Sequence, residues 1–187
     1  KSLTHIKTLT ASSSSTLSFV DGSSDVVLDS TYPIYMFKFI NIHPATDGAE
    51  FQFQCSTDSG SNYNTTITSS YFRAGHDEAD VAGQAKIVYE TSHDLAQSTS
   101  FQTIGHDIGN DSDQQYSGIL NLFNPSSTTF VKHFVSVGNL VQVNNYSFNP
   151  YVAGYCNTTS AVDAVQFKFS SGNIDAGTIK LYGLKDS

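Results

Sequence analysis

The chain contains few of the residues that build helices. It has no Trp, one Met and only 14% charged residues, and the strong helix formers Leu, Lys, Glu and Arg are scarce. In their place stand 13 Phe, 10 Tyr and many Ser, Thr, Asn and Gln. β-branched, aromatic and hydroxyl side chains suit a pleated, half-buried surface. The composition therefore predicts an all-β protein.

Positive charge is also scarce, and it is scattered. Nine Lys and Arg stand against 17 Asp and Glu, which gives a net charge of −8 and a pI near 4.9. Binding to phosphates needs clustered positive charge. We therefore expect no nucleic acid partner and no anionic membrane partner, and we interpret the acidity as a means of staying soluble at high copy number.

Long apolar runs are absent, and there are only two cysteines. No run approaches the roughly 20 residues of a membrane span, and the first residues do not form a signal-peptide core. We expect that the chain stays where it is made or that a leader was removed. Cys55 ends the alternating segment 51–55 on its Phe side, which favours a buried free thiol. The sequence leaves open whether Cys55 and Cys156 pair.

Alternation of apolar and polar residues indicates strands along most of the chain. In the last stretch Val165, Phe167 and Phe169 share one side, and we predict a β-hairpin over 164–184. Further strands are predicted at 16–20, 25–28, 34–42, 51–55, 64–72, 118–123, 128–137 and 151–156, with 144–150 as a loop. Eight to ten short strands with turns about every 8–12 residues are typical of an antiparallel β-sandwich or barrel. We expect a single domain over 1–187 with an extended N-terminal arm at 1–15.

The region 75–117 differs from the rest because His, Asp and Glu dominate it. We expect a loop-rich excursion with short strands near 86–90 and 101–104, and a partner-facing surface if the protein has one. The segment 107–113 offers oxygen ligands but lacks the EF-hand spacing and its closing Glu. A solvated acidic loop is the favoured interpretation, so we predict no metal site and leave calcium binding open.

No pattern points to catalysis. A Gly-x-Ser-x-Gly elbow is absent, and the acidic residues lie mostly in turns, where exposure keeps their pKa values ordinary. We therefore predict no catalytic residue and no cofactor. Six tyrosines near loops or strand ends could stack on sugar rings, although packing at rims and interfaces is the more common role of such residues. They are Tyr63, Tyr71, Tyr89, Tyr116, Tyr146 and Tyr155.

Five segments together resemble a known family. They are 39–51, 56–63, 122–134, 153–160 and 170–183. As a set they resemble virion structural proteins of tailed bacteriophages, chiefly marine ones, and the resemblance is weakest across 75–117. It implies a jelly-roll-like fold and a place in the virion. It implies no enzymatic activity and transfers no catalytic residue.

This resemblance leads to three functional hypotheses. The first is a decoration or cement protein that contacts the major capsid protein and forms a closed homo-oligomer, for which a trimer would be suitable. The second is a tail-fibre or spike module that binds host glycan, and the third is a secreted glycan-binding module of cellular origin. Candidate interface residues lie in the arm and in the excursion. They are Leu3, His5, Ile6, His76, His93, His106 and Tyr116.

Overall fold

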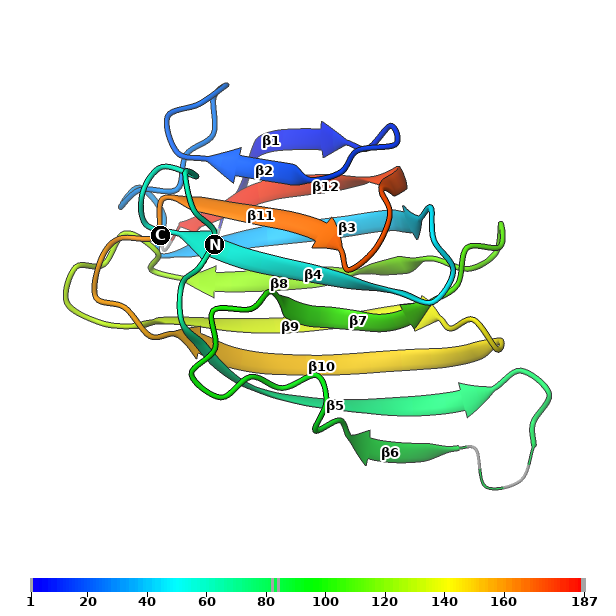
Figure 1. Cartoon of the computed structure of the whole chain (residues 1–187). Helices are drawn as coiled ribbons and strands as arrows, with labels where there is room; N and C mark the ends of the chain where they lie inside the picture. Colours follow the sequence, from blue (N-terminus) through cyan, green and yellow to red (C-terminus); the bar gives the residue numbers. More distant parts are fainter. Residues whose placement is uncertain (1, 82, 84, 186–187) are drawn as a thin grey trace.

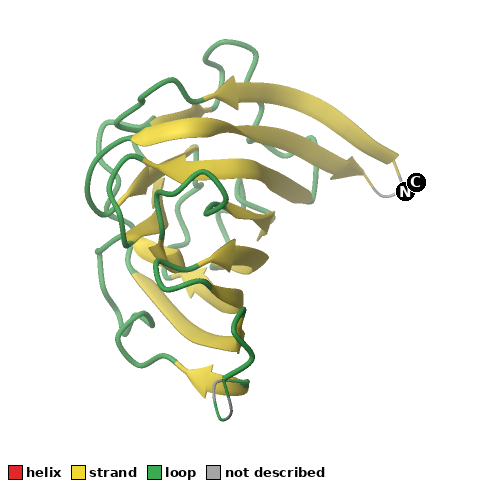
Figure 2. Cartoon of the chain, turned by 90° about the vertical axis from the view of Figure 1, so that its right-hand side faces the viewer, coloured by secondary structure: helices red, strands yellow, loops and turns green. Residues whose placement is uncertain are grey.

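Strands are the only regular elements in the part of the chain that the structure describes, residues 2–81, 83 and 85–185 of a computed structural model (Figures 1 and 2). In chain order they are β1 (Ser2–Thr10), β2 (Leu17–Val20), β3 (Ile34–Pro44), β4 (Ala49–Ser56), β5 (Ile67–Asp77), β6 (Lys86–Tyr89), β7 (Gln102–Ile108), β8 (Tyr116–Phe123), β9 (Lys132–Val141), β10 (Tyr146–Cys156), β11 (Ala164–Phe169) and β12 (Ile174–Lys185). No helix in this part is long and apolar enough to cross a membrane.

These strands form two sheets packed as a sandwich. The larger sheet has eight strands in the order β1-β12-β3-β8-β9-β10-β5-β6, and the smaller has four in the order β2-β11-β4-β7. Neighbouring strands are antiparallel in both sheets. Figure 1 shows the smaller sheet in front of the larger one. The predicted all-β sandwich is therefore confirmed, with twelve described strands instead of eight to ten.

The strand order is that of a jelly roll with additions. In a jelly roll the first, eighth, third and sixth strands form one sheet, and the second, seventh, fourth and fifth form the other. Here β2 to β8 take the places of the first to seventh strands, and β11 takes the place of the eighth. The smaller sheet, β2-β11-β4-β7, then has the order first, eighth, third, sixth. The larger sheet has the order second, seventh, fourth, fifth, which is β3-β8-β5-β6, when the β9–β10 hairpin and the flanking β1 and β12 are left out. The hairpin widens the larger sheet in its middle.

An aromatic core fills the space between the sheets. Phe167 on β11 is fully buried and lies with its ring centroid 5.2 Å from those of Phe37 and Phe39 on β3. Phe51 on β4 stacks on it at 5.9 Å. These residues occupy the inward positions of strands in which buried and less buried residues alternate, as the sequence pattern predicted.

Three local predictions are wrong. The stretch 164–184 is not a hairpin, because β11 belongs to the smaller sheet and β12 to the larger one. The neighbours of β11 are β2 and β4. Residues 25–28 form no strand, although Val26 and Leu28 are buried. Residues 146–150 are not a loop but the first half of β10.

The extended N-terminal arm and the loop-rich excursion both contribute strands to the sheets. The N-terminal arm is β1, which pairs with β12 from Ser2–Lys185 to Thr10–Thr178 at one edge of that sheet. The excursion contributes β6 at the opposite edge and β7 in the smaller sheet. After β6, the chain stays hydrogen bonded along β5, where Leu95 O accepts from Ser69 N and Ser98 O from Ile67 N. One side chain of this segment, that of His93, lies beside Tyr71 on the inner face of β5, with ring centroids 5.5 Å apart.

Candidate functional site

A polar pocket of about 330 Å³ opens where β6 and the segment after it meet β5, β7 and β10. Its walls come from five parts of the chain: β5, β6 with the segment after it, β7, the β9–β10 turn and β10. The lining residues are Arg73, Lys86, Glu90, Ser92, His93, His106, Asp107, Gln142, Tyr146 and Phe148. In Figure 1, β10, β5 and β6 extend beyond β7, the last strand of the smaller sheet. The pocket therefore lies at the uncovered end of the sandwich.

The pocket holds the only arginine of the chain. Arg73 Nε lies 2.6 Å from Glu90 Oε1, and the guanidinium carbon lies 3.7 Å from the centre of the Phe148 ring. Arg73 Nε has no well-aligned hydrogen-bond partner among the described residues, so the contact with Glu90 is an ion pair rather than a hydrogen bond. The ion pair and the aromatic face together hold the guanidinium in the wall. Lys86 adds a second positive charge.

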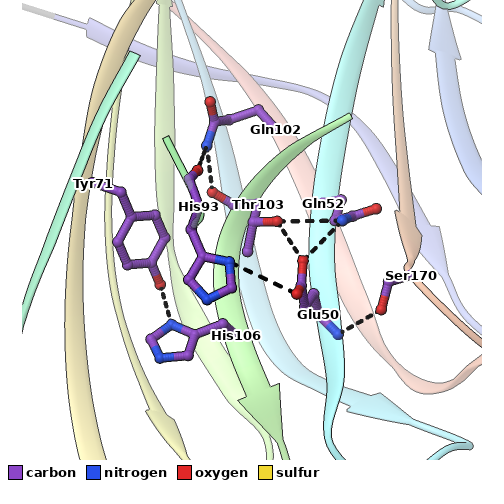
Figure 3. Close-up of polar contacts among 8 residues, drawn as sticks. All are labelled: Glu50, Gln52, Tyr71, His93, Gln102, Thr103, His106 and Ser170. Atoms are coloured by element: carbon purple, nitrogen blue, oxygen red, sulfur yellow. Dashed lines mark hydrogen bonds and ion pairs between the residues drawn. The ribbon is translucent and has the colours of Figure 1, made fainter. Parts of the chain in front are cut away.

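Two histidines stack in the same wall. The ring centroids of His93 and His106 are 4.5 Å apart with an interplanar angle of 26°. Tyr71 OH lies 2.8 Å from His106 Nδ1 (Figure 3). Burial, then the charges of His93 and Arg73, lower the pKa of His106 to about 3, while burial raises the pKa of Tyr71 well above its usual value. At neutral pH we therefore assign a neutral His106 that accepts from the Tyr71 hydroxyl and carries its proton on Nε2.

A hydrogen-bond network beside His93 holds this residue in place (Figure 3). Glu50 Oε2 accepts from Thr103 Oγ1 at 2.6 Å and from Gln52 Nε2 at 3.0 Å. Glu50 Oε1 lies 3.7 Å from His93 Nδ1. Gln102 is fully buried and donates to His93 O at 2.9 Å, which attaches the segment after β6 to β7. His93 is thus tied to both β4 and β7.

This arrangement is suited to recognising a polar ligand. The pocket offers cationic and amide donors, carboxylate acceptors, and the aromatic side chains of Tyr146 and Phe148. Binding sites commonly combine a few fixed polar groups with aromatic walls in this way. Among the described residues there is no group of three or more His, Cys, Asp or Glu placed to hold a metal ion.

The candidate interface residues from the sequence are spread over the molecule. His93 and His106 meet in the pocket. His76 lies further along β5, exposed, with its Nε2 3.4 Å from Asp80 Oδ1. Leu3, His5 and Ile6 lie on β1, at the other edge of the eight-stranded sheet from β6. The structure therefore does not bring the arm and the excursion into one surface.

Two of these candidates are wrong as surface residues. Tyr116 is fully buried, because it faces inward on β8 like Leu120 and Leu122, and its ring lies over Gly138 on β9. A Cβ at Gly138 would lie 2.5 Å from that ring, so this glycine leaves the space that the tyrosine occupies. His106 is also buried and reaches only the pocket wall.

An apolar patch that was not predicted from the sequence lies on the outside of the larger sheet. We call it the outer apolar face. It consists of Phe72, Ile87, Tyr89, Val135 and Tyr151. Phe72 is the register partner of both Tyr89 and Tyr151, and its ring stacks on that of Tyr151 at 5.1 Å and 3°. The alternation of apolar and polar residues could have revealed this patch, because the residues that face inward on a strand also determine which residues face outward.

Fold and site together define a jelly-roll β-sandwich with a polar pocket at its open end and an apolar outer face. Comparison of the chain with protein-family models, with curated proteins and with solved structures finds no match.

Proposed function

We propose that this chain is a non-enzymatic structural protein of a tailed-phage virion and that it decorates the capsid. The proposal starts from the resemblance of five sequence segments to such virion proteins. The observation that supports docking on the capsid is the outer apolar face. Jelly-roll sandwiches are recurrent building blocks of viral shells. The major capsid protein is the expected partner, and further copies of this chain are expected around a symmetry axis.

The outer apolar face has the chemistry of a protein contact. It contains five of the eight large hydrophobic side chains that are exposed among the described residues. The outward positions of β5, β6, β9 and β10 carry no Asp, Glu, Lys or Arg, although the chain as a whole has a net charge of −8. Apolar patches rimmed by polar residues mark interaction sites, and aromatic side chains are enriched at their centres. A shell protein seated here would leave the acidic loops facing solvent.

The docking role is tested by placing a charge in the outer apolar face. Ile87 exposes 77% of its surface, so Ile87→Asp should leave the fold intact and reduce capsid occupancy at least tenfold, because the carboxylate would be desolvated on docking. Occupancy is measured by cryo-electron microscopy of particles that lack their own copy and are incubated with the purified variant. Phe130→Asp is the matched control, since Phe130 is 70% exposed in a loop outside this face. Equal occupancy of the two variants, or wild-type protein found only on the tail, would contradict capsid docking through this face.

The pocket favours a second candidate function, recognition of a host-surface glycan by a tail-fibre or spike module. Lys86 is exposed at the pocket, so Lys86→Ala should weaken binding to purified host polysaccharide about tenfold without loss of stability. Lys38→Ala is the control, because Lys38 is exposed on β3 away from the pocket. Isothermal titration calorimetry measures both variants. Wild-type protein that does not bind the polysaccharide, or equal loss in the two variants, would contradict glycan binding in this pocket.

A further inference from the structure

The wall of the polar pocket contains a buried histidine whose second ring nitrogen is unpaired. His106 is only 3% exposed, yet it lines the pocket. The buried Tyr71 hydroxyl has one hydrogen-bond acceptor among the described residues, His106 Nδ1 at 2.8 Å (Figure 3). The hydroxyl therefore donates to Nδ1, and the ring proton is on Nε2. His106 Nε2 forms no hydrogen bond with a described residue and is not sealed from solvent, so its N–H is available to a ligand.

Arg73 presents a second unpaired edge to the same pocket. Its Nε lies 2.6 Å from Glu90 Oε1, and Phe148 covers one face of the guanidinium at 3.7 Å. A Cβ at Gly75 would lie 2.7 Å from Arg73 Nη1 and 3.0 Å from the Phe148 ring, so this glycine leaves the space that both groups occupy. Neither Nη atom forms a hydrogen bond with a described residue, and unlike Nε neither is fully buried. The Nη edge of a firmly held guanidinium is therefore free for a ligand.

These two donors lie close together, because both pack against Phe148. The guanidinium carbon of Arg73 is 3.7 Å from the centre of that ring, and the ring centroid of His106 is 5.3 Å from it. The paired N–H groups of a guanidinium match the two oxygens of a carboxylate, and an imidazole N–H can add a further donor. The arrangement is therefore suited to a carboxylate on the ligand.

The pocket also offers acceptors, which a simple anion would not use. Glu90 Oε2 forms no hydrogen bond with a described residue and is not fully buried, and Asp107 is exposed at the pocket. Together with Arg73 and Lys86 they give the lining two cations and two carboxylates, in a chain whose net charge is −8. An anion therefore meets less repulsion here than on the protein as a whole. The carboxylates can accept from hydroxyl groups, and the partly exposed ring of Tyr146 offers a surface for a sugar ring.

We propose that this pocket selects an acidic sugar, a pyranose that carries a carboxylate. The Nη groups of Arg73 and Nε2 of His106 bind the carboxylate, and Glu90 and Asp107 accept from the ring hydroxyls. This inference deepens the second candidate function and rests on it, because it names the class of glycan that the pocket takes. Hydrogen bonds to a charged group are among the stronger ones, so a sugar without the carboxylate should bind at least tenfold more weakly.

The first test compares small probes on the wild-type protein at pH 7 by isothermal titration calorimetry. The probes are glucuronate and galacturonate, their parent sugars glucose and galactose, and acetate. A parent sugar has a hydroxymethyl group where the uronate has its carboxylate, and acetate has a carboxylate without a ring. At least one uronate should bind tenfold or more tightly than its parent sugar and than acetate. Equal affinity for uronate and parent sugar, equal affinity for uronate and acetate, or no binding of either uronate would overturn the proposal.

The second test locates the carboxylate with Arg73→Lys. Lysine keeps the positive charge beside Glu90 but lacks the fork of parallel N–H groups. Affinity for the bound uronate should therefore fall at least tenfold, and affinity for the parent sugar should change less than twofold. Lys38→Arg is the matched control, because Lys38 is exposed on β3 outside the pocket, and it should change neither affinity. Equal loss in the two variants, or no loss in Arg73→Lys, would overturn the proposal.

Nitrogen-15 NMR of the histidine rings in the wild-type protein tests the second donor without any substitution. In the free protein His106 should carry its proton on Nε2, and the Nε2 signal should move when the uronate is added. His106→Gln assigns the signal, because it removes it. A proton on Nδ1, or an Nε2 signal that stays in place when the uronate binds, would overturn the proposal.

Competition separates this inference from the glycan-binding function itself. Displacement of bound host polysaccharide by the uronate would support both. Polysaccharide that binds in the pocket and is not displaced by saturating uronate would overturn the acidic-sugar inference and leave the glycan function in place. Uronate that binds in the pocket of a protein that does not bind the polysaccharide would overturn the host-glycan function alone.

Discussion

Replacing Phe167 with alanine should lower the free energy of unfolding by about 4 kcal/mol. The Phe167 ring is fully buried and contacts the rings of five other phenylalanines, which come from three strands other than its own. Those rings are Phe19 on β2, Phe37 and Phe39 on β3, and Phe51 and Phe53 on β4. Their strands belong to both sheets, so the cavity left by the substitution cannot be closed by movement of one neighbour.

Urea denaturation at pH 7 measures this loss for the variant and the wild type. Phe130→Ala is the control and should change stability by less than about 0.5 kcal/mol, because its ring is 70% exposed. If Phe167→Ala cost no more than the control, Phe167 would not be at the centre of the core. A changed slope of the denaturation curve would instead show a change in the surface exposed on unfolding or a loss of two-state behaviour.

The fold class could be predicted because alternation is a local property. Val165, Phe167 and Phe169 are buried, as their spacing indicated, and the same holds for Phe51 and Phe53. Burial of alternate residues does not reveal which strand lies beside which. For that reason β11 and β12 looked like a hairpin, although the turn between them carries the chain from one sheet to the other.

The jelly-roll order was expected from the family resemblance rather than from the strand pattern. Long-range pairings such as β2 with β11 and β5 with β10 join segments far apart in the chain, and no local signal records them. Tyr116 shows the same limit at the level of one residue. It lies at the end of a region rich in His and Asp, which suggested a surface position, yet it continues the inward set of Leu120 and Leu122.

The site was only partly visible in the sequence. His93 and His106 stood out as histidines in the excursion, but their contact depends on Gln102, which fastens the segment after β6 to β7. Arg73 was unremarked because its partner Phe148 lies on β10, within a stretch expected to be a loop. The pocket is thus a product of the tertiary fold, while the outer apolar face follows directly from strand alternation.

Stability should fall as the pH drops from 7 to 5, by about 2 kcal/mol on account of His106 alone. Its pKa is about 3 in the folded chain and 6.5 in an unperturbed histidine. Below pH 6.5 the unfolded chain binds a proton that the folded chain does not bind until the pH is near 3, so acid favours unfolding throughout this window. Burial of the ring, which contacts Tyr71 on β5 and Phe148 on β10, is the main cause of the low pKa. The charges of His93 and Arg73 lower it further.

Urea denaturation of His106→Gln at pH 7 and pH 5 isolates this contribution, because the amide does not titrate and can still accept from the Tyr71 hydroxyl. The variant should be less stable at pH 7 but lose about 2 kcal/mol less than the wild type between the two pH values. His76→Gln should keep the full loss, since the His76 side chain is 57% exposed and does not line the pocket. An unchanged pH dependence in His106→Gln would mean that the ring is protonated in the folded chain, and the stacked pair with His93 would then have to carry positive charge inside the pocket wall.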